Sequence, residues 1–218
     1  MANWESKTVR DVITDMQDGK IVLPVIQRNL VWNEDKMELL FDSLFRQNSF
    51  GSIICIEEVS DKKPLFAHRL FTRDARTLRD GDYKLSLYPD KLDRTLYFVV
   101  DGQQRLQSFY TGLCGKYNDS SLYYDLFSDC KKGEYEFRFA VSEDRLPAKI
   151  KNEENEESER QCLWYPASSL FEQLKSMETS RRVANDIAKE KTSLIHTNKD
   201  RLKILFMISM REYSEIIA

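Results

Sequence analysis

The sequence predicts an α+β fold in which a small mixed sheet is surrounded by helices. Three observations lead to it. Apolar residues recur at helical spacing in several segments, and short continuous apolar runs typical of strands lie between them. Glycine and proline are sparse, with 7 and 5 residues in a chain of 218. Such a shortage of turn residues argues against a sandwich of many short strands, and the length is sufficient to bury a core.

The first third of the chain combines helix and strand patterns. Ser6 is a candidate N-cap for a helix that stops at Gly19. We expect a strand over residues 21–23, because Pro24 blocks a helix there, and a second helix capped by Asn33. The apolar residues that define the two helices are Val9, Val12, Ile13 and Met16, then Met37, Leu40, Phe41, Leu44 and Phe45.

Two further strands are expected on either side of a less regular region. Residues 52–59 predict a strand that is central in its sheet at its start, and residues 60–95 predict irregular structure with a short helix or hairpin. Residues 96–100 form a continuous apolar run of the buried type, which Asp101 and Gly102 end. The helix that follows is indicated by Leu106, Phe109, Tyr110, Leu113 and the end signal Gly115.

The second half of the chain predicts a β-hairpin and then helices. The hairpin joins residues 123–127 and 135–141 around Lys131-Lys132-Gly133. The charge run 149–160 predicts an exposed loop, and the pattern from about residue 167 is mostly helical.

The end of the sequence affects the domain organisation we expect. Residues 210–218 are typical of a helix without a stop signal, so we expect the full protein to continue. We expect a core domain over residues 1–145, followed by a charged loop and helical extension over 146–218.

Composition excludes several classes of protein. With 33 basic and 36 acidic residues the net charge is -3, which argues against a broad surface that neutralises nucleic-acid phosphates. Any contact with a polyanion should therefore be local. The four cysteines include no Cys-x-x-Cys pair, and no apolar stretch approaches the roughly 18 residues of a membrane span. No P-loop is present. A cytoplasmic protein with reduced thiols is the expectation.

The most informative motif follows the strand at 96–100. A helix N-terminus presents free N–H groups and a partial positive charge to an anion. Gly102 lets the backbone approach a ligand, Arg105 suits phosphate, and Gln103 and Gln104 add neutral donors and acceptors. Asp101 could hold a divalent ion. The alternative, in which Asp101 only caps the helix and Arg105 is a surface cation, stays open.

Two other motifs contain candidate binding residues. Between Leu23 and Trp32, the Gln27-Arg28 pair on extended backbone could point into a cleft, although a linker anchored by Trp32 is the favoured alternative when this motif is taken alone. Arginines also recur at spacings of three and four, which would line one face of a helix and could meet DNA phosphates. Acidic neighbours favour a salt-bridged, solvated face there instead. These arginines are Arg69, Arg73, Arg76 and Arg79.

Three segments, in order, resemble the signatures of the GmrSD restriction-endonuclease N-terminal domain family. Leu-Pro-x-x-Gln-Arg-x-x-Val-Trp at 23–32 resembles the first. Phe-Asp-Ser-Leu at 41–44 with Phe-Gly-Ser-Ile at 50–53 resembles the second, and Val-Val-Asp-Gly-Gln-Gln-Arg-Leu at 99–106 the third and most specific. The likeness is strong up to about residue 115 and weak beyond it. It implies a ParB/sulfiredoxin-like core with a C-terminal helical extension.

The resemblance also implies binding and hydrolysis of a nucleoside triphosphate with Mg²⁺, as the regulatory domain of a phage-defence system that restricts modified DNA. The residues it assigns to the nucleotide are Gln27, Arg28, Gly102, Gln103 and Arg105. Those it assigns to catalysis are Asp101, Gln104 and Arg105, with Asp101 also placed at the metal. The candidate DNA contacts, Arg69, Arg73 and Arg76, come from their spacing and not from the resemblance.

Family members usually continue into an Asn-Gly-rich segment and often a His-Asn-His nuclease domain, which this sequence lacks. With only His68 and His196, we expect no nuclease site here and a nuclease domain or subunit as partner. Modified DNA and further copies of the chain are the other partners considered. A non-catalytic DNA-binding or assembly module of the same fold is the alternative function.

Overall fold

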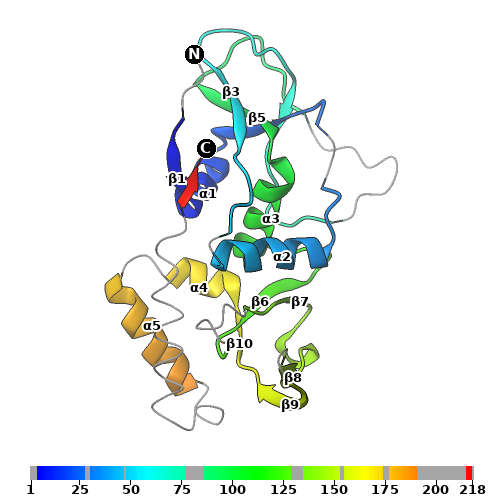
Figure 1. Cartoon of the computed structure of the whole chain (residues 1–218). Coiled ribbons are helices and arrows are strands. Elements are labelled where there is room, and N and C mark those ends of the chain that lie inside the picture. The colour runs from blue at the N-terminus through cyan, green and yellow to red at the C-terminus, as the bar shows by residue number, and fades with distance from the viewer. Residues whose placement is uncertain are drawn as a thin grey trace.

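A four-stranded sheet forms one end of the molecule in this computed structural model (Figure 1). Its strands are β2 (Ile21–Pro24), β3 (Ile54–Glu58), β4 (His68–Arg69) and β5 (Leu96–Asp101), in the spatial order β3-β5-β2-β4. Strands β2 and β5 are parallel, and the other two pairs are antiparallel. The predicted α+β class with a small mixed sheet is confirmed, whereas the ParB/sulfiredoxin-like core stays a prediction.

The structure describes most of the chain in eight stretches. These are residues 4–27, 30–46, 48–76, 86–128, 135–152, 155–173, 177–190 and 215–217. Arg28 and Arg79, which the sequence singles out, and the hairpin turn at 131–133 lie outside them.

Helix α1 (Val9–Gln17) begins at Thr8 rather than at Ser6, the predicted cap. The Thr8 hydroxyl accepts a hydrogen bond from the Asp11 N–H (3.1 Å), and the Asp11 carboxylate accepts one from the Thr8 N–H (3.2 Å). This reciprocal capping box fixes the start of the helix. Ser6 instead lies in strand β1 (Ser6–Thr8), which pairs with β11 (Glu215–Ile217).

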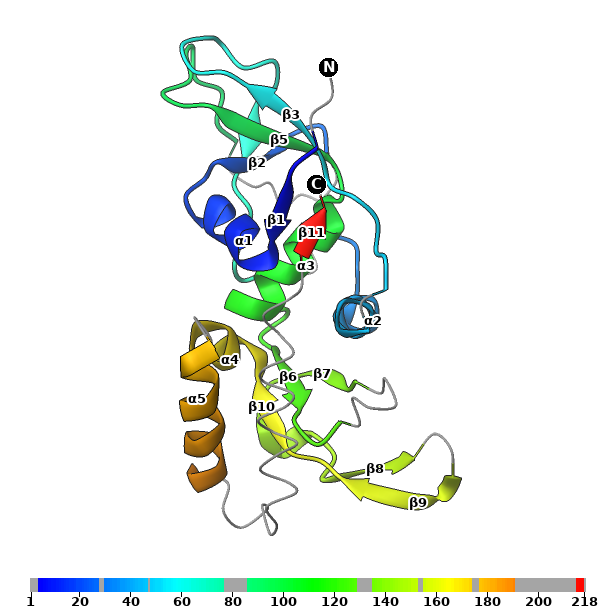
Figure 2. The ribbon, with the colours of Figure 1, turned by 60° about the vertical axis from the view of Figure 1, so that its left-hand side comes forward.

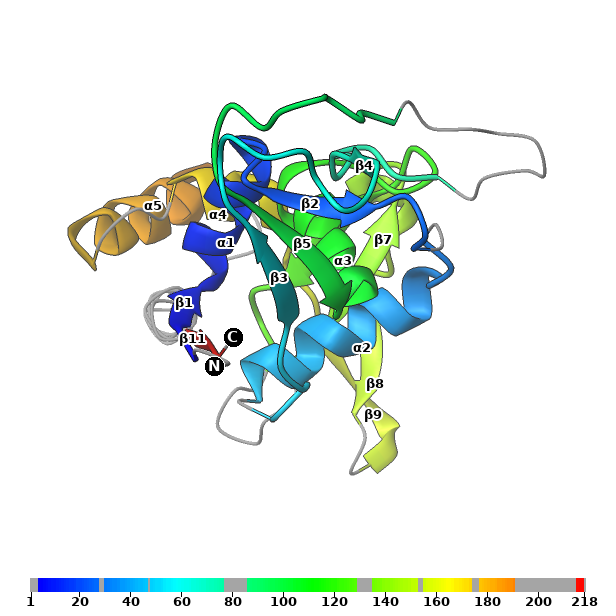
Figure 3. The same ribbon diagram turned by 90° about the horizontal axis from the view of Figure 1, so that it is seen from above.

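Helices α2 (Glu34–Phe45) and α3 (Gln103–Cys114) lie between the four-stranded sheet and the rest of the molecule, as Figures 1 and 2 show. Asn33 caps α2 as predicted, accepting a hydrogen bond from the Lys36 N–H (3.3 Å). The rings of Phe41 and Phe109 meet edge to face with centroids 5.6 Å apart, which joins the two helices in the core. Seen from above the sheet, α3 lies beneath β5 (Figure 3).

The order of strands corrects one prediction about the sheet. Strand β3 lies at the edge, with β5 as its only partner among the described residues, and not at the centre. Ile54 and Ile56 are accordingly 48% and 37% exposed. The described parts of residues 60–95 contain β4 and isolated bridges, and no helix.

A second sheet lies on the other side of α2 and α3 (Figure 2). It contains β6 (Ser121–Asp125), β7 (Phe137–Ala140) and β10 (Trp164–Pro166) in the order β10-β6-β7. The antiparallel pairing of β6 with β7 confirms the predicted hairpin. Asp125, which is fully buried, accepts hydrogen bonds from the N–H groups of Phe127 and Leu163 and pairs with Arg160.

The charge run at 149–160 is a β-hairpin and not the exposed loop that its composition predicts. Strands β8 (Lys149–Asn152) and β9 (Asn155–Gln161) pair antiparallel after the short 3₁₀ helix η1 (Glu143–Arg145). Lys151 faces Glu159 across the pair, so opposite charges are neighbours. The hairpin projects from the end of the molecule opposite the four-stranded sheet (Figure 2).

The C-terminal part confirms the predicted helices up to residue 190. These are α4 (Ala167–Gln173), which packs against α3 and β6, and α5 (Met177–Glu190). The predicted helix over 210–218 is wrong at residues 215–217, which form β11; residues 210–214 are not described. The boundary at residue 145 stays a prediction, and β10 pairs with β6 across it. No helix within the described stretches is long and apolar enough to cross a lipid bilayer.

Candidate functional site

The candidate site lies where β5 ends and α3 begins. Gly102 connects the two in the left-handed region (φ 88°) and occupies the N-cap position of α3. This positive φ favours glycine, and a Cβ at residue 102 would also lie 2.4 Å from the Ile53 Cδ1, which would have to shift. Gly102 makes no side-chain cap for α3, and a helix N-terminus presents backbone N–H groups and a partial positive charge to an anion.

Asp101 and Arg105 form an ion pair across this turn. The Arg105 Nη2 lies 3.1 Å from the Asp101 Oδ2, and the Arg105 Nη1 donates to the Phe50 carbonyl oxygen (2.7 Å). Only 15% of the Arg105 side chain is exposed, whereas Asp101 is 64% exposed. The alternative reading of the motif is therefore wrong on both counts: Asp101 is not a helix cap, and Arg105 is not a surface cation.

The turn between α2 and β3 is shaped around the same guanidinium. Gly51 has a φ of 88°, and a Cβ there would lie 2.7 Å from the Arg105 Nη1. The second signature segment thus contributes backbone to the site, through Phe50 and Gly51. The sequence contains both residues in that segment, but no pattern in it indicates a contact with Arg105.

The first signature segment reaches the site through Gln27. The Gln27 Nε2 donates a hydrogen bond to the Val100 carbonyl oxygen (3.0 Å), the last residue before Asp101. The structure therefore brings Gln27 to the end of β5. Trp32 packs against the core beside Met37 of α2, which is the anchor that the linker alternative expects. Arg28, the other predicted residue of this segment, lies outside the described residues.

Gln103 and Gln104 are both 8% exposed at the start of α3. The Gln104 Oε1 accepts a hydrogen bond from the Val31 N–H (2.9 Å), so its amide contacts the segment that contains Gln27. The same helix face continues with Gln107, which the sequence did not single out. Its Nε2 donates to the Thr72 carbonyl oxygen (2.6 Å). Only the helical spacing of Gln104 and Gln107 could have indicated this shared face.

The helix that the arginine spacing predicts is absent over the described residues 69–76. Arg69 lies in β4, is 9% exposed, and donates from Nη2 to the Gln27 carbonyl oxygen (2.9 Å); burial lowers its pKa. Arg73 donates from Nε to the Cys114 carbonyl oxygen (2.7 Å). Arg76 is exposed on non-helical backbone. These side chains consequently do not form one solvated, salt-bridged face, because the backbone at 69–76 is not helical and two of them serve as internal donors.

The one acidic side chain of the motif, Asp101, suits a metal ion that is bound together with a phosphate ligand. Among the described residues no three His, Cys, Asp or Glu side chains gather closely enough to hold a metal by themselves. Asp101 is an exposed carboxylate directly before the N-terminus of α3. Mg²⁺ is commonly bound through one or two carboxylates, water and the phosphates of a nucleotide, so Asp101 fits a metal that arrives with its ligand.

Comparison with known proteins gives two matches. The model of a family described as "GmrSD restriction endonuclease, N-terminal domain" matches residues 9–216. Over 106 residues the chain is 30% identical to a protein named "Uncharacterized protein MJ0686" from Methanocaldococcus jannaschii. That match covers 49% of this chain and 17% of the relative, so the chain spans a minor part of the length of the curated protein it matches.

Proposed function

Because this chain belongs to the family of GmrSD restriction endonuclease N-terminal domains, we propose that it binds a nucleoside triphosphate with Mg²⁺ at the start of α3 and hydrolyses it. Family membership makes the chain a component of a restriction system. In the proposal, the nucleotide regulates a nuclease domain or subunit outside this chain, and the system acts on modified DNA. The proposal places this protein in the cytoplasm.

The convergence of two distant segments is the observation that carries this proposal. The Gln27 Nε2 and the Val100 carbonyl oxygen are 3.0 Å apart, and the next residues are Asp101 and Gly102. The backbone N–H groups of a helix N-terminus and the helix dipole favour a phosphate at such a place. The charge of Arg105 lies in the same turn. Such an arrangement supports polyphosphate binding better than a lone helix N-terminus does.

Each residue has a distinct part in the proposed reaction. Asp101 presents its exposed carboxylate in front of the turn and orients water or the metal. Mg²⁺ bound with the nucleotide would neutralise phosphate charge. Arg105 and the first N–H groups of α3 stabilise negative charge that develops on the transferred phosphoryl group. Phosphoryl transfer depends mainly on such positioning and charge stabilisation, so this set is chemically adequate.

A thermal-shift experiment tests binding directly. The full chain is heated with Mg²⁺ and each of the four common ribonucleoside triphosphates. At about 100 times Kd, binding adds about 2.7 kcal/mol to the free energy of unfolding, which raises Tm on the order of 5–10 °C for a chain of this size. Release of inorganic phosphate from the stabilising nucleotide is measured in parallel.

Two variants make the test specific for the site. Asp101→Asn should remove the Tm increase, because it removes the carboxylate charge. Asp61→Asn is the matched control, because the Asp61 carboxylate is also exposed and is paired with Lys91. Asp61 comes after the C-terminal end of β3, whereas Asp101 pairs with Ile54 at the start of that strand. Asp61→Asn should keep the increase. Absence of a shift with all four nucleotides, or an equal shift in Asp101→Asn, contradicts the proposal.

A further inference from the structure

We propose that Gln104 and Arg69 are positioning residues that hold the segment around Gln27 against the end of β5. This segment, called the Gln27 loop, comprises the described residues 25–27 and 30–32 between β2 and α2. The inference rests on the proposed function, because it assigns these two residues a role in nucleotide affinity. The resemblance assigned Gln104 to catalysis. The present inference instead makes it a residue that holds the Gln27 loop in place.

Hydrogen bonds to three different elements hold the Gln27 loop, in addition to the bond from the Val25 N–H to the Ala67 carbonyl oxygen (2.8 Å). The Gln104 Oε1 on α3 accepts from the Val31 N–H (2.9 Å). The Arg69 Nη2 on β4 donates to the Gln27 carbonyl oxygen (2.9 Å), and the Gln27 side chain donates to the Val100 carbonyl oxygen on β5 (3.0 Å). The loop is therefore held through two of its backbone groups, the Val31 N–H and the Gln27 carbonyl oxygen, and through the Gln27 side chain.

Both anchors are buried beneath the loop. Gln104 is 8% exposed and Arg69 is 9% exposed. A buried amide or guanidinium that loses its hydrogen bond cannot replace it with water, which costs about 1–3 kcal/mol and more for a charged group. These contacts therefore strongly restrict the position of the loop, in contrast to contacts between exposed side chains.

The geometry of α3 directs the side chains of Gln104 and Arg105 to different neighbours. Successive residues point about 100° apart around a helix axis. Gln104 consequently faces the Gln27 loop, while Arg105 faces the Phe50 carbonyl oxygen. One turn further, Gln107 faces Thr72. The amide of Gln104 is thus directed at Val31, and the exposed carboxylate of Asp101 is the side chain of this motif that reaches solvent.

An unanchored loop would have to be ordered by the nucleotide itself. The ordering cost would then be subtracted from the binding free energy, so affinity falls although no ligand contact has been removed. Gln104→Leu keeps a side chain of similar size and removes the acceptor. Gln104→Glu keeps an oxygen acceptor for the Val31 N–H.

The first measurement is amide hydrogen exchange at Val31 in the free chain. Gln104→Leu should speed this exchange about five- to tenfold, as expected for the loss of one hydrogen bond, and Gln104→Glu should keep it slow. Gln107→Leu is the matched control, since Gln107 is a buried glutamine on the same helix that binds Thr72 instead. It should leave Val31 exchange unchanged. Unchanged exchange in Gln104→Leu overturns the proposal.

The second measurement is affinity for Mg²⁺ with ATP, or with the triphosphate that stabilises the wild-type chain most. Gln104→Leu should lower affinity about tenfold, equivalent to about 1.4 kcal/mol, and Gln107→Leu should bind like the wild type. Faster Val31 exchange with unchanged affinity overturns the positioning role while the proposed function stands. A wild-type chain that binds no nucleotide removes the proposed function, and the exchange data still decide whether Gln104 anchors the loop.

Arg69 provides an independent pair of variants if Gln104→Leu does not fold. Arg69→Lys keeps a donor for the Gln27 carbonyl oxygen, whereas Arg69→Met removes it. The lysine variant should recover most of the affinity that the methionine variant loses. Equal affinity of the two variants contradicts a positioning role for Arg69.

Discussion

Gln27 and Val100 are 73 residues apart in sequence, and the side-chain amide of the first donates a 3.0 Å hydrogen bond to the carbonyl oxygen of the second. The sheet explains this contact. Gln27 follows β2 and Val100 lies near the end of β5, and these strands are parallel neighbours. Parallel strands have their carboxyl ends at the same edge, where ligands of open α/β sheets commonly bind. Both segments therefore meet there.

Replacement of Gly102 by alanine should destabilise the fold. The left-handed backbone and the 2.4 Å approach to the Ile53 Cδ1 predict a loss of about 1–3 kcal/mol in the free energy of unfolding. Urea denaturation measures it. Adding Ile53→Val, which removes Cδ1, should recover part of the loss. No loss in Gly102→Ala would show that the turn has another conformation.

Arg105 and Asp101 should differ in their effects on stability. Arg105→Met removes buried donors to Phe50 and Asp101, so we expect a loss of about 1–3 kcal/mol. Asp101→Asn should change the free energy of unfolding by less than about 1 kcal/mol, because its carboxylate is mostly exposed. Equal losses in urea denaturation would contradict the burial of the Arg105 side chain and the exposure of the Asp101 carboxylate.

The buried ion pair of Asp125 and Arg160 should be important for the second sheet. Asp125→Asn leaves Arg160 without its carboxylate and weakens the acceptor for the Leu163 N–H, so we expect a loss of about 3–5 kcal/mol. Asp61→Asn, in an exposed pair with Lys91, should cost no more than about 1 kcal/mol. Similar losses in the two variants, measured by urea denaturation, would show that Asp125 is hydrated.

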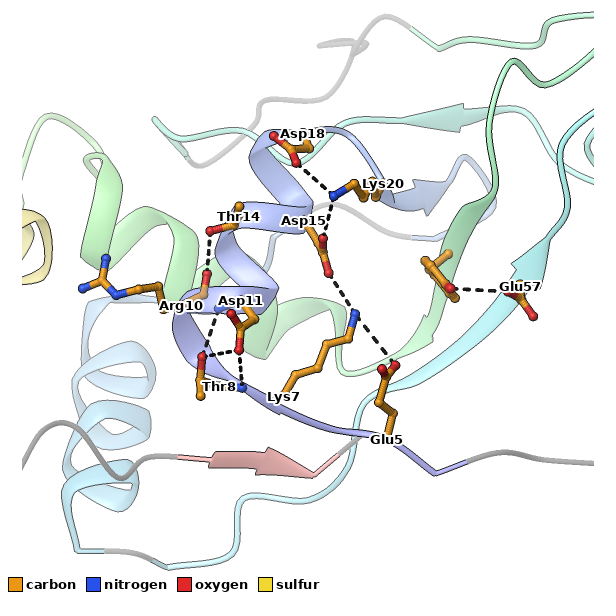
Figure 4. A network of polar contacts seen from close by, with 11 residues as sticks. Glu5, Lys7, Thr8, Arg10, Asp11, Thr14, Asp15, Asp18, Lys20 and Glu57 are labelled. Carbon is orange, nitrogen blue, oxygen red and sulfur yellow. Dashed lines mark hydrogen bonds and ion pairs between the residues drawn. The ribbon is translucent and has the colours of Figure 1, made fainter. Parts of the chain in front are cut away.

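The polar network at α1 predicts a dependence of stability on pH (Figure 4). Burial tends to raise the pKa of Asp15, but hydrogen bonds from Lys7 and Lys20 outweigh it and hold the pKa below its ordinary value of 3.8. A lowered folded-state pKa stabilises the fold above that ordinary value, and the contribution is lost as pH falls through the folded-state pKa.

Asp15→Asn should therefore be less stable than the wild type by on the order of 1 kcal/mol near neutral pH. The difference should shrink below pH 3.8, the ordinary pKa of the carboxyl. Asp18→Asn is the control, because Asp18 is more exposed than Asp15 and pairs with Lys20, whereas Asp15 pairs with both Lys7 and Lys20. A difference that is constant down to pH 2 would be inconsistent with the Asp15 pairing.

Local sequence patterns predicted the elements whose determinants are local. Helices α2 and α3 and strand β5 follow from apolar spacing and end signals. Ser6 and Thr8 are both good N-caps, and Asp11 three residues after Thr8 decides between them. The β8–β9 hairpin escaped prediction because its strands lack the alternation of apolar and polar residues that identifies a half-buried strand.

The site was only partly predictable because its contacts are tertiary. The strand–turn–helix pattern led to the residues from Asp101 to Arg105, and the resemblance joined Gln27 to them. It could not indicate that Gln104 binds the Val31 N–H, since that depends on how a loop crosses α3. For the same reason, the spacing of the arginines suggested a helix where Arg69 lies in a strand.

Hydrogen–deuterium exchange of the full chain, with and without Mg²⁺ and a non-hydrolysable triphosphate, tests the central claim most directly. The account predicts slower exchange in two separate peptides, one containing Gln27 and one containing Gly102, with no change in the β8–β9 hairpin. Protection of only one of these peptides, or protection confined to another part of the molecule, would contradict a shared nucleotide site at the start of α3.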